Sequence, residues 1–310
     1  MEGILPLNKP KGMTSHDCVF KLRKILKTKK IGHTGTLDPD VTGVLPICVG
    51  RATKIAEYIT DAGKAYEGEV TIGISTTTED KSGDVVESKS VTQSFTRSEI
   101  LQMLENLTGE IEQTPPMFSA VKVNGKKLYE YARAGIEVER PSRTVTIYEL
   151  ALLDDRDVFE GETIAFRFRA KCSKGTYIRT LAVMMGEALG YPAHMSDLVR
   201  IQSSSFTLED CFTLEQVAQY AEEGRQDELL KPLEYGLSHL PKRVINDKVA
   251  MKVMNGAVLS KPADISLQAG EPFVVYYRDI ALAIYKIHET KPDYIKPVKV
   301  LRTGLKERNG

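Results

Sequence analysis

The sequence predicts an α+β protein with two domains, a large one over residues 1–236 and a small one over residues 241–302. Segments such as residues 66–75 alternate between apolar and polar side chains, which is typical of strands with one buried face. Helices whose starts carry capping-box patterns lie between these segments. A break over Gly236–Pro241 then separates them from a second, shorter group of alternating segments.

The composition bounds the class of protein. Of the 310 residues, 42% are hydrophobic and 27% are charged, and the formal net charge is zero, as in many globular proteins with an ample core. The four cysteines lie far apart without a C-x-x-C pair, so neither a zinc site nor a disulfide framework is expected. The start lacks the features of a signal peptide, and no apolar stretch is long enough to cross a bilayer. We expect a cytoplasmic protein without membrane association, metal or cofactor, because P-loop and dinucleotide patterns are also missing.

The N-terminal segment combines a short strand, a turn and a basic helix. Residues 4–7 are apolar enough for a strand, and Pro10 and Gly12 predict the turn that follows. Ser15 is expected to cap the helix. Its apolar face comprises Cys18, Val19, Leu22, Ile25 and Leu26. Residues 1–64 hold eleven Lys or Arg against six Asp or Glu, a local net charge of +5 that is either a solvated surface or a site for a polyanion.

A loop is predicted over Ile31-Gly32-His33-Thr34-Gly35-Thr36-Leu37-Asp38-Pro39-Asp40-Val41-Thr42-Gly43. Its glycines admit backbone angles closed to other residues, and Pro39 stiffens the chain directly after Asp38. The stretch lacks the apolar run of a buried strand or helix. An ordinary turn has the same composition, but the basic helix directly before it favours an active site with Asp38 at the bend.

The remaining elements of the large domain follow from periodicity and caps. Strands are predicted over residues 44–49, 66–75, 144–153 and 163–172. Helices are predicted over residues 50–60, from Thr96 to Gly109, from Arg179 to Gly190 and from Thr213 to Gly224. Residues 76–95 are polar and are interpreted as an exposed hairpin or loop. The strand over residues 163–172 has one basic face, which either binds RNA or is solvated.

The small domain is predicted to be a compact β unit. Its clearest strands are residues 273–277 and 280–287. Residues 303–310 are polar and are expected to form a frayed tail.

Several motifs in a fixed order carry a resemblance to a known family. They are Asn8-Lys9-Pro10-Lys11-Gly12-Met13-Thr14-Ser15, Gly32-His33-Thr34-Gly35-Thr36-Leu37-Asp38-Pro39, Lys64-Ala65-Tyr66, Thr78-Glu79-Asp80-Lys81-Ser82-Gly83, Gln113-Thr114-Pro115-Pro116-Met117-Phe118-Ser119-Ala120, Ser173-Lys174-Gly175-Thr176-Tyr177-Ile178-Arg179 and Leu198. Between Leu7 and about Phe206 the chain therefore resembles the bacterial TruB family of tRNA pseudouridine synthases. The resemblance implies a pseudouridine synthase fold, with a central mixed and mostly antiparallel sheet flanked by helices, and a C-terminal PUA-like domain.

The resemblance also implies an activity and a set of site residues. The activity is isomerisation of uridine 55 in the TΨC loop of tRNA, with the target base flipped out of the loop. The catalytic aspartate of the family matches Asp38, and its substrate-binding residues match Tyr66, Tyr177, Arg179, Leu198 and His33. The family commonly has Leu-Arg-Arg-Thr and then glycine where this chain has Leu198-Val199-Arg200-Ile201 and then Ser204. This departure removes one arginine and makes the turn less permissive.

The expected partner is tRNA, with the TΨC stem-loop at the large domain and the acceptor end at the small one. We expect a monomer whose phosphate contacts come from Lys9, Lys11, Lys24, Lys27, Lys30 and Lys54. An aspartate with an ordinary pKa is ionised at neutral pH, so a single carboxylate beside the ribose needs no tuning.

Two alternatives remain. The first is a protein that binds or folds tRNA without catalysis, with a merely structural aspartate turn. The second is a phosphatase, because Asp38-Pro39-Asp40-Val41-Thr42 fits the D-x-D-x-T pattern. That fold requires an apolar strand directly before the first aspartate, and none is predicted there.

Overall fold

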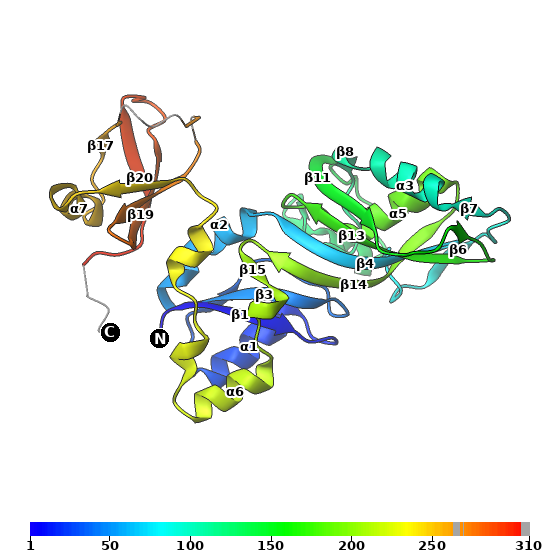
Figure 1. Cartoon of the computed structure of the whole chain (residues 1–310), viewed down its shortest axis with the longest axis horizontal. Coiled ribbons are helices and arrows are strands. Elements are labelled where there is room, and N and C mark those ends of the chain that lie inside the picture. Colours follow the sequence, from blue (N-terminus) through cyan, green and yellow to red (C-terminus); the bar gives the residue numbers. More distant parts are fainter. Residues whose placement is uncertain (263–266, 269, 305–310) are drawn as a thin grey trace.

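A computed structural model describes residues 1–262, 267, 268 and 270–304, which form a nine-stranded sheet, a five-stranded sheet and short ribbons (Figure 1). In the large sheet the main strand order is β1-β3-β14-β4-β13-β11-β8, with β2 beside β3 and β15 beside β14. The strands are β1 (Gly3–Lys9), β2 (Ile31–His33), β3 (Thr42–Val49), β4 (Lys64–Ile72), β8 (Gly109–Gln113), β11 (Arg143–Leu152), β13 (Ile164–Cys172), β14 (Ala193–Ser203) and β15 (Phe206–Thr207). All pairs are antiparallel except β14 with β3, which confirms the expected mixed, mostly antiparallel sheet.

The parallel pairing of β14 with β3 depends on a close backbone approach. Gly43 on β3 has φ +107°, and a Cβ there would lie 2.2 Å from the carbonyl oxygen of Arg200 on β14. A side chain at Gly43 would therefore push the two strands apart. Because β3 directly follows the aspartate loop, this contact brings Leu198 and Arg200 to that loop.

Helices and short segments surround the large sheet. The helices are α1 (Ser15–Ile25), α2 (Ala56–Asp61), α3 (Arg97–Asn106), α4 (Leu128–Arg133), α5 (Ile178–Leu189) and α6 (Leu214–Glu222), with 3₁₀ turns η1 (Gly50–Ile55), η2 (Leu208–Asp210), η3 (Gln226–Leu229) and η4 (Leu233–Leu237). The ribbons pair β5 (Ile74–Thr76) with β6 (Val85–Ser88), β7 (Phe95–Thr96) with β12 (Val158–Phe159), and β9 (Lys122–Val123) with β10 (Lys126–Lys127). In Figure 1, α1 and α6 lie near β1, whereas α3 and α5 lie near β11 and β13.

The helix caps match the sequence predictions at two of three helices. Thr96 and Thr213 each complete a capping box, as predicted. The cap predicted at Ser15 is wrong, because Thr14 is the N-cap and accepts a hydrogen bond from the Asp17 amide. The hydroxyl of Ser15 instead bonds to the aspartate loop.

The five-stranded sheet has the order β16-β18-β19-β20-β17 and packs against α7. Its elements are β16 (Lys242–Ile245), α7 (Asp247–Met254), β17 (Leu259–Ser260), β18 (Phe273–Tyr277), β19 (Ile280–Ile287) and β20 (Tyr294–Val300). The strands β18 and β19 have the predicted bounds. The predicted tail, 303–310, lies outside the described residues except for 303 and 304.

An apolar cluster joins the two sheets. It combines Ile4, Phe206 and Leu233 from the large unit with Tyr276 and Leu301 from the small one. Beside this cluster, the carboxylate of Glu234 accepts hydrogen bonds from Arg302 Nη1 (2.6 Å) and from the amide of Ala281 (3.0 Å). The small unit is therefore packed against the large one.

The turn between β14 and β15 holds Ser204 at φ +54°, a region that favours glycine. Its hydroxyl oxygen is buried without a hydrogen-bond partner among the described residues. We expect Ser204→Gly to stabilise the protein by about 0.5–1 kcal/mol, because relief of the positive φ exceeds the added chain entropy of glycine. Thermal unfolding should show a rise in Tm of about 1–3 °C.

Ser204→Ala is the matched control for this prediction, since it removes the hydroxyl but keeps the Cβ. The alanine variant should be less stable than the glycine variant. Equal stability of the two variants would show that the backbone angle carries no strain.

Candidate active site

Asp38 lies in a loop whose backbone is fastened to neighbouring segments. Ser15 at the start of α1 accepts a hydrogen bond from the Leu37 amide (2.8 Å). The backbone and side chain of Thr34 both donate to the carbonyl of Pro46 on β3, at 3.1 and 3.0 Å. These bonds hold the residues before Asp38. Only residues 34–41 of the predicted loop lack regular secondary structure, because its two ends belong to β2 and β3.

Lys9 fastens the loop from the other side. Its side chain is fully buried, and its ammonium donates to the carbonyls of Pro10 (2.9 Å), Pro39 (3.1 Å) and Val41 (2.6 Å). All three protons of the ammonium are thus used within the protein. The prediction that Lys9 contacts RNA phosphate is wrong, because the group is enclosed by the loop that it holds.

Arg179 at the start of α5 pairs with the Asp38 carboxylate. Its Nε lies 3.1 Å from Asp38 Oδ2, and its Nη1 lies 3.8 Å from Asp80 Oδ2. The guanidinium also donates to the carbonyls of Thr78 (2.8 Å) and Phe118 (2.9 Å). The Arg179 side chain is only 7% exposed, whereas that of Asp38 is 39% exposed. The arginine is therefore fixed, and it presents a carboxylate that a ligand can reach.

Burial raises the pKa of Asp38 above its ordinary value. The Arg179 guanidinium lowers this pKa, while the negative charge of Asp80 raises it further, and the net direction is upward. The sequence interpretation of an ordinary aspartate is corrected in this respect. Enclosure of the loop, which sequence alone did not indicate, is the physical cause.

A pocket of about 450 Å³ opens beside this carboxylate. Such a volume suits a small organic group. Its aromatic and apolar lining includes Tyr66, Phe118, Tyr129, Tyr177 and Leu198, and its charged lining comprises Asp38, Lys64, Arg143, Lys174, Arg179 and Arg200. Five of the six residues expected to bind or transform the substrate thus line one pocket, namely Asp38, Tyr66, Tyr177, Arg179 and Leu198.

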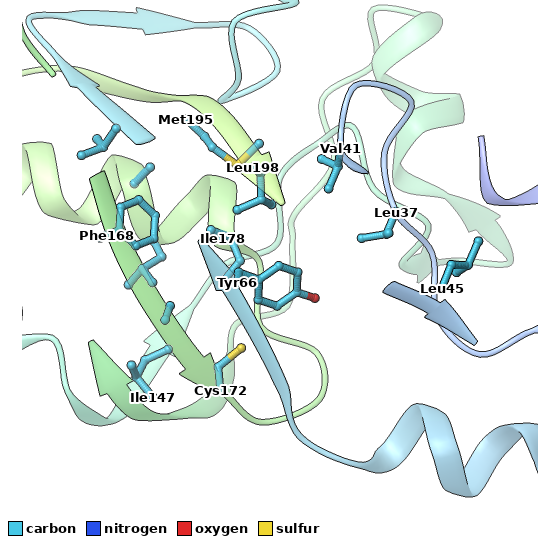
Figure 2. Packing of buried hydrophobic residues seen from close by; sticks show 14 of the residues in the cluster. Leu37, Val41, Leu45, Tyr66, Ile147, Phe168, Cys172, Ile178, Met195 and Leu198 are labelled. Atoms are coloured by element: carbon cyan, nitrogen blue, oxygen red, sulfur yellow. The ribbon is translucent and has the colours of Figure 1, made fainter. Parts of the chain in front are cut away.

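Tyr66 on β4 is buried in the wall of this pocket. It pairs across the sheet with Arg200 on β14. Figure 2 shows its ring beside Ile178 and Leu198, with the hydroxyl directed away from Phe168. Burial raises the pKa of Tyr66, and the Arg200 guanidinium that bonds to its hydroxyl opposes this shift.

Tyr177 is held through its backbone. The Gln113 side chain accepts a hydrogen bond from the Tyr177 amide (3.0 Å) and donates to its carbonyl (3.2 Å). The guanidinium carbon of Arg143 lies 4.9 Å from the centroid of the Tyr177 ring, within cation–π range. Gln113 belongs to one of the motifs of the resemblance, which implied no role for it.

His33 lies on β2 and does not line the pocket. Its Nδ1 accepts a hydrogen bond from the Gly35 amide at 3.3 Å. Burial lowers the pKa of His33, with smaller contributions from Arg200 and His16. The histidine is therefore near the aspartate loop but outside the pocket.

The other predicted phosphate contacts differ in accessibility. Lys11, Lys24, Lys27 and Lys30 are exposed. Lys54 is partly buried and donates to the carbonyl of Val300 (2.7 Å), so it links the two units. A phosphate contact at Lys54 stays a prediction.

Two of the three basic side chains on one face of β13, Arg167 and Arg169, share the carboxylate of Glu67 on β4. Glu67 on β4 accepts hydrogen bonds from Arg169, at 2.6 Å from Nη2, and lies 3.6 Å from Arg167. These pairs support the interpretation of a solvated outer face for this strand.

Within residues 1–262, 267, 268 and 270–304, no group of three or more His, Cys, Asp or Glu could hold a metal ion. Over the same residues, no helix is long and apolar enough to cross a membrane.

Two family models match the chain. The N-terminal domain of the TruB family pseudouridylate synthases matches residues 23–178, and the C-terminal domain of tRNA pseudouridylate synthase B matches residues 179–238. The second match ends before β16, so it covers α5, β14 and α6 of the large unit and not the five-stranded sheet.

Curated relatives match almost the whole chain. The tRNA pseudouridine synthase B of Geobacillus thermodenitrificans is 61% identical over 302 residues, which cover 97% of this chain and 100% of the relative. The protein of the same name from Bacillus cereus is 61% identical over 303 residues and 97% of each chain.

Solved structures show the same fold. A chain of a Cbf5–Nop10–Gar1 complex superposes with a TM-score of 0.75 and 31% identity, covering 97% of this chain and 85% of that one. A chain of an H/ACA ribonucleoprotein bound to a substrate RNA containing 2′-deoxyuridine superposes with a TM-score of 0.71 and 28% identity, covering 96% and 84%. The pseudouridine synthase fold implied by the motifs is confirmed.

The buried ammonium of Lys9 yields a testable prediction. We expect Lys9→Met to destabilise the protein by about 2–4 kcal/mol, because the carbonyls of Pro39 and Val41 lose their buried donor. Chemical denaturation measures this loss. Lys11→Met removes the same charge from an exposed position two residues away and should change stability by less than about 0.5 kcal/mol. Equal stability of the two variants would contradict the anchoring role of Lys9.

Proposed function

The chain belongs to the TruB family of pseudouridylate synthases and isomerises uridine to pseudouridine in tRNA, and we propose that Asp38 performs this reaction on uridine 55 of the TΨC loop. The observation that carries the proposal is the Asp38 carboxylate, 3.1 Å from the buried Arg179 and accessible from a pocket with aromatic walls. The choice of position 55 rests on the match of the motifs to this family.

A single carboxylate suits the chemistry of the isomerisation. The N1–C1′ bond breaks, the freed uracil turns, C5 bonds to C1′, and the C5 proton leaves while N1 is protonated. Positive character develops on the sugar, as it does in glycoside hydrolysis. Asp38 is the pocket carboxylate that can face this charge, and Arg179 keeps it oriented. Bound RNA must keep water away from the sugar, because water would hydrolyse the glycosidic bond instead.

The pocket also supplies surfaces for an everted base. Eversion from a folded loop costs about a few kcal/mol, and stacking on an aromatic ring returns about 1–3 kcal/mol per base. Tyr66 and Tyr177 supply rings in the pocket wall, and Leu198 packs beside Tyr66. Tyr66 is therefore the proposed stacking partner, with Tyr177 and Leu198 completing the base site.

The remaining parts of the chain are assigned to RNA contact outside the pocket. The exposed Lys11, Lys24, Lys27 and Lys30 are proposed to contact phosphates of the TΨC stem-loop. His33, beside the aspartate loop, is proposed to contact the RNA near the everted nucleotide. The domain spanning residues 241–302 is proposed to be a PUA-like unit that binds the acceptor end. The active form is proposed to be a monomer, with residues 1–236 as the catalytic domain.

The phosphatase alternative lacks its structural requirement. The D-x-D-x-T pattern needs a strand that delivers Asp38, but residues 34–41 form a loop fastened by hydrogen bonds from Ser15 and Lys9. A purely RNA-binding protein would have no need of a carboxylate fixed by a buried arginine or of an aromatic pocket beside it. Isomerisation accounts for both features.

Asp38→Asn tests the proposal. We expect turnover to fall by more than about 1,000-fold, because the neutral amide cannot stabilise the positive charge that develops on the sugar. The affinity for a TΨC stem-loop should stay within about threefold of wild type. Release of tritium from C5 of labelled uridine measures turnover without added metal or ATP, and filter binding measures affinity.

The stability of this variant is its control. The amide oxygen of asparagine can still accept a hydrogen bond from the buried Arg179, so the variant should stay folded, which thermal unfolding measures. Wild-type turnover in a folded Asn variant would remove Asp38 from the mechanism.

The raised pKa of Asp38 also predicts a pH profile. The reaction needs the carboxylate, so kcat/KM should fall as pH decreases through a pKa that lies above the ordinary value of 3.8. Asp80→Asn removes a negative charge that raises this pKa, and the acid limb should move to lower pH. The amide oxygen can still accept the hydrogen bonds that Asp80 Oδ1 takes from Thr78 and Ser82. An acid limb that moves to higher pH would show that the limb belongs to another group.

A further inference from the structure

Two buried cations line the pocket. Lys64 on β4 is 8% exposed and Arg200 on β14 is 1% exposed, and both line the pocket. Among the described residues, neither forms an ion pair with a carboxylate. Each positive charge instead relies on neutral partners, an arrangement that is costly in a buried place.

The hydrogen bonds of Lys64 leave part of its ammonium unused. Its Nζ donates to the carbonyls of Thr60 (2.7 Å) and Ala62 (3.2 Å) at the end of α2. An ammonium has three protons, so these bonds leave one donor at a residue that lines the pocket.

The guanidinium of Arg200 is similarly placed. Its Nε donates to the carbonyl of Val44 (2.7 Å), and its Nη2 lies 3.4 Å from the carbonyl of Gly35. Another contact of this group is the Tyr66 hydroxyl. These partners are neutral, so its charge is not compensated.

Gly35 leaves room between the two cations. A Cβ at this position would lie 3.6 Å from Lys64 Cε and 3.7 Å from Arg200 Nη1, so the ends of both side chains flank the same point. The backbone there has φ +128°, which excludes other residues without strain. The two like charges therefore converge at a position kept clear of any side chain.

We propose that Gly35, Lys64 and Arg200 form a phosphate subsite, which binds one of the two phosphates that flank the everted uridine. Two converging cations with free donors match the charge and the oxygen acceptors of a phosphodiester. A neutral uracil would not offset the repulsion between them, whereas a phosphate does. The subsite deepens the proposed function, because it needs RNA in the pocket.

Binding of singly neutralised RNA tests the subsite. Two TΨC stem-loops are compared with the unmodified one, each with a methylphosphonate at one phosphate that flanks the target uridine. Affinities are measured in the Asp38→Asn background, so that the RNA is not converted. We expect one of the two neutral linkages to weaken binding about tenfold, the loss of one charge-assisted contact.

Lys64→Gln should abolish this difference. The variant should bind unmodified RNA about tenfold more weakly than the protein with Lys64 does. The methylphosphonate that weakens binding to the protein with Lys64 should then cost no further affinity. Lys174→Gln is the matched control, since Lys174 lines the same pocket but is exposed and paired with Asp61 at 2.9 Å. The control should retain the full tenfold effect. A methylphosphonate effect of the same size with and without the Lys64→Gln substitution, or no effect at either phosphate, would overturn the subsite.

The pH dependence of binding offers a test that needs no variant at Lys64. Burial lowers the pKa of Lys64 to about 8, and the positive charges of Arg200 and Lys174 lower it as well. Cys172 and Asp61 act in the opposite direction. The difference in affinity between unmodified RNA and the RNA with the neutral linkage should be full below about pH 8. It should shrink above that pH, as the ammonium of Lys64 in the free protein loses its proton. Lys64→Arg should keep the difference at high pH. A constant difference up to about pH 9.5 in a protein that keeps Lys64 would contradict the assignment.

Failure of this proposal is distinguishable from failure of the proposed function. Turnover could disappear in Asp38→Asn while the methylphosphonate effect does not depend on Lys64. That outcome would leave the isomerase mechanism intact and remove only the subsite. Turnover that survives in Asp38→Asn would overturn the catalytic role whatever the binding data show.

Discussion

The ion pair between Arg179 and Asp38 is the contact on which the organisation of the site depends. Arg179 begins α5, yet its guanidinium bonds to the aspartate loop, to the Thr78 turn and to the segment at Phe118. Three segments that are far apart in sequence therefore converge on one side chain. A buried guanidinium is tolerated only with such a set of partners. The same partners fix the carboxylate of Asp38 before any RNA arrives.

The sequence predicted which residues meet at the site better than how they are held. Asp38, Tyr66, Tyr177, Arg179 and Leu198 belong to motifs in a fixed order, and all five line the pocket. Lys9 and Ser15 were misjudged, because their partners are carbonyls and amides of a loop that is 22 or more residues away. Sequence patterns report side-chain type and spacing, and a backbone carbonyl is the same at every position. The alternating strands and two of the capping boxes were predicted because those signals are local.

The pocket brings charges of both signs together. Asp38 lines it, and the negative charges of Asp80 and Asp40 nearby contribute to the raised pKa of Asp38. Lys64 and Arg200 also line it, and the repulsion between them contributes to the lowered pKa of Lys64. A nucleotide carries complementary charges, because its ribose becomes positive during cleavage while its phosphate is negative throughout. The charges that cost stability in the free protein are thus those that a bound nucleotide would neutralise.

This arrangement decides where the energy of RNA binding goes. Asp38 is oriented by Arg179, Tyr177 by Gln113, and the aspartate loop by Lys9, so little ordering of the protein is left for the moment of binding. Contacts that are already in place do not reduce affinity through lost conformational entropy. Contact energy can therefore offset the unstacking of the target uridine, which is the large cost on the RNA side. A pocket that had to assemble around the base would have to meet both costs from the same contacts.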